Sequence, residues 1–130
     1  MRLRQFGATV VGIAALVLVA RANSQTTPPG LQLSAAKIDF GEVPVDSENP
    51  PRAVMLTNST KSNITMEQII TSGIDFSQKN DCGATLAPSA QCTIQVFFKP
   101  AIPGPRIGNL DVMGSDPGSP HFIALNGIGI

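Results

Sequence analysis

Apolar and polar residues alternate through the segment 93–99, which directly follows the second of the two cysteines. One phase of the alternation holds Ile94, Val96 and Phe98. The other phase holds Thr93, Gln95 and Lys99, with the aromatic Phe97 among them. Because successive side chains of a strand point to opposite faces of a sheet, this pattern predicts a strand with one buried and one outward face.

Similar short runs recur after residue 30, where turn-forming Gly, Pro, Asn, Asp and Ser residues separate them at intervals of roughly 8 to 15 residues. The runs are 31–34, 37–40, 53–58, 64–69, 73–77, 93–98, 106–113 and 121–127. They amount to about seven strands without a long amphipathic helix. The sequence therefore predicts an all-β fold, an immunoglobulin-like antiparallel β-sandwich. Trp and Tyr are absent, so the buried Trp and the tyrosine corner of antibody domains are not expected.

The inward phase of each run predicts the hydrophobic core. This core comprises Ile38, Phe40, Val54, Leu56, Ile64, Met66, Ile69, Phe76, Ile94, Val96, Phe98, Leu110, Val112, Ile123 and Leu125. The short run 73–77 has the character of an edge strand that Phe76 anchors to the core. Phe97 falls in the outward phase of its own strand, so we expect it to be exposed or covered by a neighbouring side chain.

The N-terminus has the three parts of a secretory signal peptide. Two arginines lie within the first four residues, an apolar stretch covers 10–20, and small residues flank Arg21. We therefore expect a signal helix at 1–22, a linker at 23–30 and one immunoglobulin-like domain at 31–130; retention of the signal as an anchor is the alternative. The expected location is extracytoplasmic: the periplasm, the cell surface or the medium, with no membrane insertion after cleavage.

The charge pattern argues against a nucleic-acid or membrane-surface partner. Signal cleavage removes three of the nine basic residues and none of the nine acidic ones, so the mature chain is acidic. Its remaining basic residues are Lys37, Arg52, Lys61, Lys79, Lys99 and Arg106. They are scattered singly, whereas both kinds of partner require clustered Lys and Arg. We expect all six to be solvated surface charges.

The two cysteines of the chain are Cys82 and Cys92. In an exported protein, two cysteines are most simply explained as a disulfide. A bridge between them would close a loop of about 11 residues and stabilise the fold by roughly 2.5 to 3 kcal/mol. A catalytic thiol or a metal site remains the alternative, but a thiol needs a base, and zinc needs about four ligands.

No residue pattern predicts a catalytic, cofactor or metal site. The carboxylate pairs Asp75 with Asp81 and Asp111 with Asp116 lack a catalytic spacing. We expect these four to cap turns or to be solvated, and we expect His121, the single histidine, to be a surface residue at a strand end. The sequence thus predicts a protein that is not an enzyme. The alternative is a small enzyme or metal-binding protein that uses His121 with Asp111, Asp116 or a free cysteine.

Several motifs, taken in order, resemble one family of domains. They are Leu33-Ser34, Lys37 to Val45, Val54 to Asn58, Asp75-Phe76-Ser77, Asn80-Asp81-Cys82-Gly83, Cys92-Thr93-Ile94, Phe98-Lys99-Pro100 and Ala124 to Gly129. They resemble the bacterial choice-of-anchor D repeat. That repeat is similar to the ASH domain of abnormal spindle and Hydin proteins, an immunoglobulin-like fold also related to major sperm protein and PapD-type chaperones.

The resemblance implies a seven-stranded sandwich, a bridge between Cys82 and Cys92, and a role in protein interaction without catalytic residues. We therefore expect a non-catalytic exported module for protein–protein interaction or cell-envelope assembly, which recognises protein partners through its surface or an edge strand. The candidate partner surface is Phe97, Thr93 and Gln95. A purely structural spacer is a further alternative. No cofactor is expected.

Overall fold

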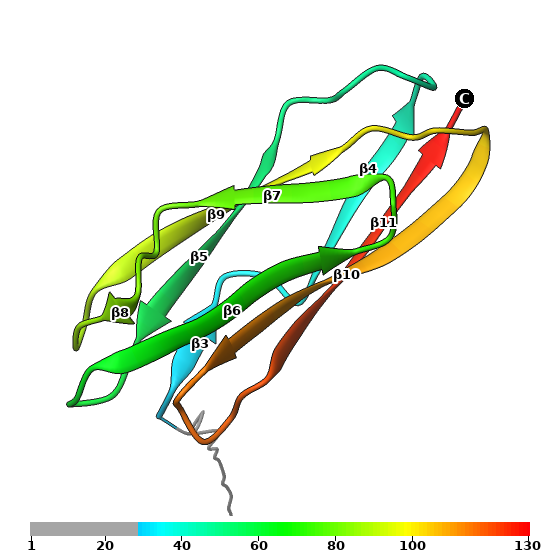
Figure 1. The fold of residues 1–130 in the computed structure, drawn as a ribbon. Helices are drawn as coiled ribbons and strands as arrows, with labels where there is room; N and C mark the ends of the chain where they lie inside the picture. The colour runs from blue at the N-terminus through cyan, green and yellow to red at the C-terminus, as the bar shows by residue number, and fades with distance from the viewer. Residues whose placement is uncertain (1–28) are drawn as a thin grey trace, which may run out of the picture.

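The structure is a computed structural model that describes residues 29–130 (Figure 1). The expected signal helix at 1–22 and most of the linker at 23–30 lie outside the described residues. Nine strands make up the described part: β3 Leu31–Leu33, β4 Lys37–Val43, β5 Arg52–Asn58, β6 Ile64–Ser72, β7 Phe76–Asn80, β8 Thr85–Leu86, β9 Gln91–Phe98, β10 Gly104–Gly114 and β11 His121–Gly129. No helix in this part is long and apolar enough to span a membrane.

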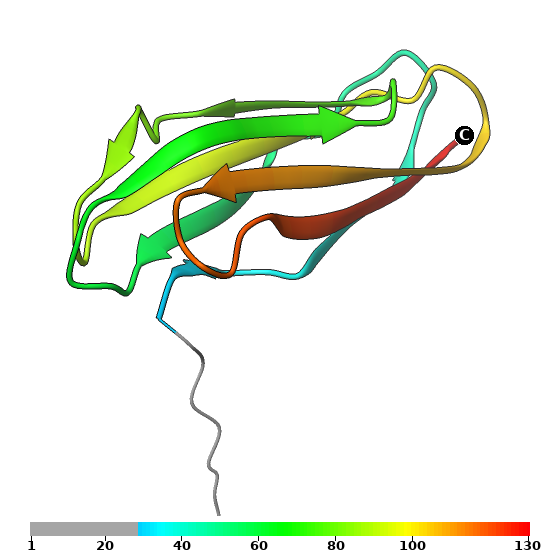
Figure 2. The ribbon, with the colours of Figure 1, turned by 60° about the horizontal axis from the view of Figure 1, so that its bottom comes forward.

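The strands form two sheets that pack face to face, as the two views show (Figures 1 and 2). The five-stranded sheet has the order β4-β11-β10-β6-β8, and the four-stranded sheet has the order β3-β5-β9-β7. Seven strands have five residues or more, whereas β3 and β8 are shorter. The prediction of an all-β immunoglobulin-like sandwich is confirmed.

One strand pair departs from the antiparallel arrangement that the sequence predicts. β4 runs parallel to β11, beside it at the edge of the five-stranded sheet (Figure 1). The chain leaves β3, which is antiparallel to β5 in the other sheet, and crosses over within the segment 34–36. This crossover places β4 next to the last strand of the domain. The local alternation carries no information on strand direction, so it could not reveal this pair.

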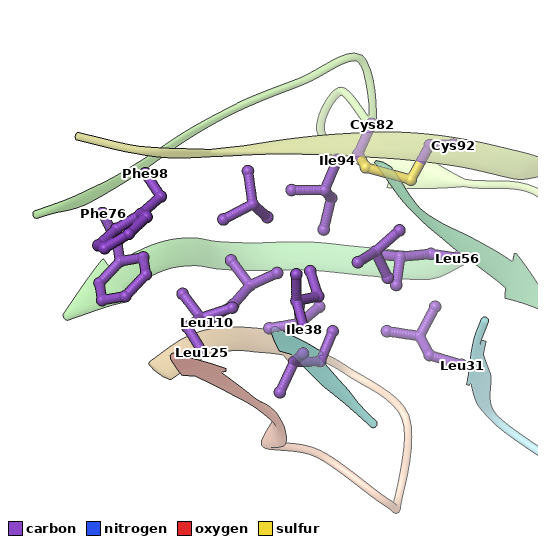
Figure 3. Packing of buried hydrophobic residues seen from close by; sticks show 14 of the residues in the cluster. Leu31, Ile38, Leu56, Phe76, Cys82, Cys92, Ile94, Phe98, Leu110 and Leu125 are labelled. Atoms are coloured by element: carbon purple, nitrogen blue, oxygen red, sulfur yellow. A yellow bond between two sulfur atoms is a disulfide. The ribbon is translucent and has the colours of Figure 1, made fainter. Parts of the chain in front are cut away.

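The core lies between the two sheets and matches the inward phase of the sequence (Figure 3). Of the residues expected there, all are buried except Met66 and Ile69, which are half-buried and pack against the cluster. The structure adds Leu31, Cys82, Leu86 and Cys92 to the buried cluster, and Val43, for which the sequence after Phe40 already indicated a core contact, is buried as well. Because buried apolar side chains each stabilise a fold by about 1.5 to 3 kcal/mol, this cluster is the main source of stability.

Three aromatic rings fill one end of the core. The ring centroids of Phe76 and Phe98 are 4.9 Å apart, and Phe40 lies 5.4 Å from Phe98. β11 passes so close to this cluster that a Cβ atom at Gly127 would collide with the ring of Phe98. A glycine is therefore required at this position of the closing segment Ala124 to Gly129.

Arg106 and Asp75 form an ion pair, whereas the sequence predicts a solvated charge for Arg106 and a turn-capping or solvated carboxylate for Asp75. Nε of Arg106 donates a hydrogen bond to Oδ2 of Asp75 at 2.6 Å, and the Asp75 side chain is only 2% exposed. The other carboxylate oxygen accepts a hydrogen bond from the backbone N–H of Ala101 at 2.8 Å. The chain between β9 and β10 thus folds over the start of β7 and buries Asp75, while Arg106 stays partly exposed. The sequence spacing could not show this contact.

Candidate interaction surface

The expected partner residues Thr93, Gln95 and Phe97 lie together on the outward face of β9. Gln95 is exposed, whereas Thr93 and Phe97 are half-buried. In the antiparallel ladder with β7, Ser77 lies opposite Phe97, and Lys79 lies opposite Gln95. The structure therefore brings all three residues onto one face of the four-stranded sheet, next to the outward side chains of β7.

β7, and not β9, is the edge strand beside these residues. β9 lies between β5 and β7, so its backbone is paired on both sides. β7 pairs only with β9 within the described chain. The hypothesis of edge-strand recognition therefore applies to β7, with the side chains of β9 forming the floor beside the edge.

Gln78 and Asn80 of β7 present their backbone groups at the free edge, as the pairing of the residues next to β7 shows. The C=O of Asp75 accepts a hydrogen bond from Lys99, and the N–H of Asp81 donates one to Thr93. Antiparallel strands alternate the direction of these groups from residue to residue, so the backbone groups of residues 76, 78 and 80 point away from β9.

Phe76 already uses these groups within the domain, because its N–H bonds to the C=O of Gly73 and its C=O accepts the hydroxyl of Thr71. Within residues 29–130, the N–H and C=O groups of Gln78 and Asn80 have no hydrogen-bond partner.

Two shallow hollows border the β7 edge. One, of about 330 Å³, is lined by Lys79, Asn80, Asp81, Thr93 and Gln95. The other, of about 310 Å³, is lined by Glu48, Ser77, Gln78, Lys79 and Phe97. Lys79 lines both hollows, and its ammonium group lies 6.0 Å from the centroid of the Phe97 ring. A bound strand could place its side chains in these hollows on either side of Lys79.

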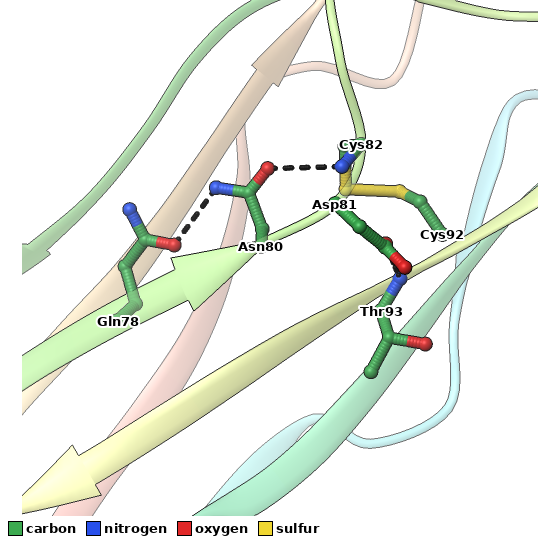
Figure 4. Close-up of a disulfide and its surroundings, with 6 residues drawn as sticks. All are labelled: Gln78, Asn80, Asp81, Cys82, Cys92 and Thr93. Carbon is green, nitrogen blue, oxygen red and sulfur yellow. Dashed lines mark hydrogen bonds between the residues drawn. A yellow bond between two sulfur atoms is a disulfide. The ribbon is translucent and has the colours of Figure 1, made fainter.

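The disulfide holds the C-terminal end of this edge in place (Figure 4). Cys82 follows β7 and is bonded to Cys92 within β9, as the sequence led us to expect. The N–H of Cys82 donates to Oδ1 of Asn80 at 3.0 Å. Asp81 is exposed, and its Oδ1 accepts the N–H of Thr93 at 2.7 Å, so it joins the end of β7 to β9 instead of capping the turn. The motif 80–83 therefore fixes the position where the β7 edge ends.

Because of the disulfide, neither cysteine is a free thiol that could serve in the alternative functions, an enzyme or a metal-binding protein. Cys82, Cys92 and Asp81 offer potential ligand atoms within 4.8 Å of one another. Both sulfur atoms are bonded to each other and are not thiolates. Because thiolates are the sulfur ligands that zinc requires, this group is not a zinc site in the oxidised protein.

His121 and Asp116 form a pair in which Asp116 is buried and His121 is half-buried. His121 is therefore not the surface residue that the sequence predicts, whereas Asp116 has the first of its two expected roles, since it caps its turn and is not solvated. Nε2 of His121 lies 2.8 Å from Oδ2 of Asp116, whose side chain is fully buried. Asp116 also accepts hydrogen bonds from the hydroxyl of Ser119 and the N–H of Leu31. The Asp116 carboxylate thus joins the β10–β11 loop to the start of β3, a contact that spans 85 residues of sequence.

The pair does not have the arrangement of a nucleophilic site. The hydroxyl of Ser119 donates to Asp116 and accepts the N–H of Gly114, so it is not directed at His121. Asp111, the other carboxylate considered with His121, lies opposite Phe122 in the β10–β11 ladder and therefore on the other face of the sheet. Asp111 is half-buried rather than solvated.

Both buried carboxylates are held in the ionised form. Burial raises the pKa of Asp116, but the hydrogen bonds from His121, Ser119 and Leu31 outweigh it, so the pKa lies below its ordinary value of 3.8. Burial likewise raises the pKa of Asp75, and the contacts with Arg106 and Ala101 lower it further than burial raises it. These interactions stabilise the fold above the ordinary pKa of an aspartate.

The sequence reasoning missed a second exposed face. Ile107 is 79% exposed and Phe122 is 60% exposed, and both lie on the outward side of the five-stranded sheet. A signal for them exists in the sequence. Because Ile123 and Leu125 take the inward phase of their strand, the intervening phase that contains Phe122 must point outward.

A comparison with family models decides the relationship of the chain. The model described as HYDIN/CFA65/VesB-like, Ig-like domain matches residues 29–128. The chain belongs to this family. The matched region of this HYDIN/CFA65/VesB-like domain contains both sheets and the disulfide. No curated protein sequence matches the chain significantly.

Solved structures with the same fold include two bacterial proteases and one human protein. The secreted serine protease VesC from Vibrio cholerae has 18% identity and a TM-score of 0.58, over 77% of this chain and 23% of VesC. The Vibrio cholerae VesB protease has 16% identity and a TM-score of 0.60, over 76% of this chain and 31% of VesB. The chain thus spans about a quarter to a third of these proteases.

The human match is the ASH / PapD-like domain 7 of CEP192, with 13% identity and a TM-score of 0.55. It covers 88% of this chain and 96% of that domain. At these identities the structures show a shared fold. Together with the family match, they confirm that the HYDIN/CFA65/VesB-like domain is an ASH-like immunoglobulin fold.

Proposed function

We propose that this domain is a non-catalytic, extracytoplasmic module that binds a protein partner by strand addition at β7. The observation that carries the proposal is the free edge of β7, where Gln78 and Asn80 present unpaired backbone groups beside Phe97, Thr93 and Gln95. Exposed strand edges pair readily with another chain, and side-chain hollows next to the edge select the partner.

Three observations support a location outside the cytoplasm. A disulfide persists in oxidising compartments and is rare in reducing ones, and this domain contains one between Cys82 and Cys92. The N-terminal pattern of charge and apolar residues is typical of a secretory signal. The name of VesC describes that protein as secreted. Export to the periplasm, the cell surface or the medium is therefore part of the proposal.

The mechanism uses the backbone for affinity and side chains for specificity. An incoming strand would form hydrogen bonds with Gln78 and Asn80, each of which contributes about 0.5 to 1.5 kcal/mol. Its side chains would contact Phe97 and Lys79 in the adjacent hollows. Because the disulfide and the bonds of Asp81 fix the end of β7, little conformational entropy is lost at the edge on binding.

A proline substitution at the edge tests the proposal. Gln78→Pro removes an N–H that points away from β9, so the β7–β9 ladder stays intact while the edge loses a donor. Gln78→Ala is the matched control, because it removes the side-chain bond to the C=O of Ile69 and keeps the backbone N–H. Lys61→Ala, in the exposed turn between β5 and β6, is a distant control.

The assay is quantitative pull-down from the native cell envelope, with circular dichroism to verify that each variant folds. We expect Gln78→Pro and Phe97→Ser to recover at least tenfold less partner than the wild type, and both controls to recover the wild-type amount. Recovery of no partner above background, or equal recovery by all folded variants, would contradict the proposal. Equal recovery would instead favour binding elsewhere or a spacer role.

A further inference from the structure

The outward face of the five-stranded sheet carries a row of three neighbouring side chains that the β7 proposal does not use. Asp111 of β10 lies opposite Ile70 of β6 on one side and opposite Phe122 of β11 on the other. These three strands form the middle of the sheet (Figure 1). Ile70 is 43% exposed and Phe122 is 60% exposed. A carboxylate thus lies between two exposed apolar side chains.

A hollow of about 470 Å³ lies next to this row. The adjoining row across the strands consists of the smaller side chains of Ser72, Asn109 and Ala124, all of which line the hollow. Ile107, which precedes Asn109 by two residues along β10 and lies farther from Asp111, also lines the hollow and is largely exposed. The face therefore has apolar projections at Phe122 and Ile107 with a depression between them, a relief that an apolar side chain of a partner can enter.

The carboxylate of Asp111 lacks a partner within the described chain. Its Oδ1 atom is buried and accepts no hydrogen bond. An acceptor that is buried without a donor costs about 1 to 3 kcal/mol, and more when it is charged. A cationic donor from outside that pairs with the Asp111 carboxylate would recover part of this cost.

The charges on the rest of the face indicate which partner fits. Asp39 lies opposite Asn126, and Glu42 lies opposite Ile128, so two further carboxylates border the face along β4. Lys37, opposite Ala124, is the single cation in this set. A second copy of the chain would bring Asp111 and its acidic neighbours against like charges, which disfavours binding. A basic partner has the complementary charge.

We propose that this face binds a protein segment that presents an Arg or Lys between two apolar side chains. The cation pairs with the carboxylate of Asp111 and contacts the face of the Phe122 ring. One flanking apolar side chain enters the hollow between Phe122 and Ile107, and the other packs on Ile70. This surface lies on the sheet opposite to β7 and β9, so it is independent of the strand-addition site.

Synthetic peptides with matched sequences test the proposal. The probe is a Gly/Ser peptide with a central Leu-Arg-Leu, and the controls have Leu-Glu-Leu or Ser-Arg-Ser at the centre. Each is titrated into the ¹⁵N-labelled protein, and binding is followed by the backbone amide shifts. We expect Leu-Arg-Leu to shift the amides of Ile70, Asp111 and Phe122 at low salt, with a dissociation constant of about 1 mM. The effect should weaken with salt, and both controls should bind several-fold more weakly.

Two substitutions localise the interaction. Asp111→Asn keeps the shape of the side chain and removes its charge, so it should weaken Leu-Arg-Leu about fivefold and reduce the salt dependence of its binding. Phe122→Ser changes an exposed side chain and should weaken the peptide by a similar factor. Lys61→Ala is the control and should bind like the wild type. If Asp111→Asn does not fold, Phe122→Ser and the salt titration of the wild type still test whether the peptide binds this face.

Four results would overturn the proposal. The first is equal binding of the Leu-Arg-Leu and Leu-Glu-Leu peptides, and the second is no binding of either. The third is a set of shifts confined to β7 and β9, which would assign the peptide to the strand-addition site instead. The fourth is a concentration-dependent shift of the Phe122 region without peptide, because this would show that a second copy of the chain occupies the face.

Discussion

The buried carboxylate of Asp116 provides the sharpest test of how the β10–β11 loop is joined to the start of β3. Asp116→Ala removes three hydrogen bonds at once: those with the N–H of Leu31, the hydroxyl of Ser119 and Nε2 of His121. Hydrogen bonds to a charged group contribute about 1.5 to 3 kcal/mol each, but the substitution also removes the cost of burying the charge. We expect a net loss of about 3 kcal/mol from the free energy of unfolding.

Urea denaturation followed by circular dichroism measures this loss. For a domain of this size, the dependence of the unfolding free energy on urea is about 1 to 3 kcal/mol per M, so the midpoint should fall by about 1.5 M. Glu67→Ala is the control, because Glu67 is also a carboxylate but is exposed, and its side chain makes no hydrogen bond or ion pair in the described chain. A midpoint shift of Asp116→Ala no larger than that of the control would refute the reasoning.

The same residue predicts the response to acid. Because the pKa of Asp116 in the folded protein lies below 3.8, the unfolded chain takes up the proton first as the pH falls. The stability from this group is therefore present above about pH 4 and is lost below it, as the pH approaches the folded pKa. The Asp116→Ala variant should lose less stability than the wild type over this range, and an identical loss in both would contradict the assignment.

Three further predictions follow from the other contacts. Arg106→Met leaves the carboxylate of Asp75 buried without its cation. It should lower the free energy of unfolding by about 2 kcal/mol in urea denaturation, less than for a fully buried pair, because the Arg106 side chain is partly exposed. An unchanged midpoint would argue against the ion pair. Replacement of Cys82 and Cys92 together by Ser should cost roughly 2.5 to 3 kcal/mol, and addition of a reductant should then have no effect on the variant, whereas it should destabilise the wild type. Gly127→Ala places a methyl group against the ring of Phe98 and should cost about 1 to 3 kcal/mol; a melting temperature equal to that of the wild type would show that the close approach is not real.

The sequence was sufficient for the parts of the fold that depend on local periodicity. Alternation assigns each side chain of a strand to a face, so the inward positions of Ile94, Val96 and Phe98 could be predicted without any knowledge of their partners. The same rule placed Thr93, Gln95 and Phe97 on one outward face. The outward position of Phe122 could have been predicted by this rule as well, because buried and outward residues alternate along its strand β11.

The strand order and the buried charges depend on contacts between distant segments, so the sequence could not reveal them. The edge character of the run 73–77 could be predicted, but its neighbour could not: β7 pairs with β9, which pairs with β5 on its other side. Asp75 is buried by Arg106, 31 residues away, and Asp116 is tied to Leu31, 85 residues away. At the sequence level, each of these carboxylates is indistinguishable from a solvated turn residue.

Amide hydrogen exchange of the partner-bound protein tests strand addition at β7 most directly. The experiment compares the free domain with its complex with the partner captured from the cell envelope. If a partner strand pairs with β7, the amides of Gln78 and Asn80, which point away from β9, should become protected by at least tenfold in exchange rate. Unchanged exchange at Gln78 and Asn80 in a saturated complex would contradict the proposed mode of binding.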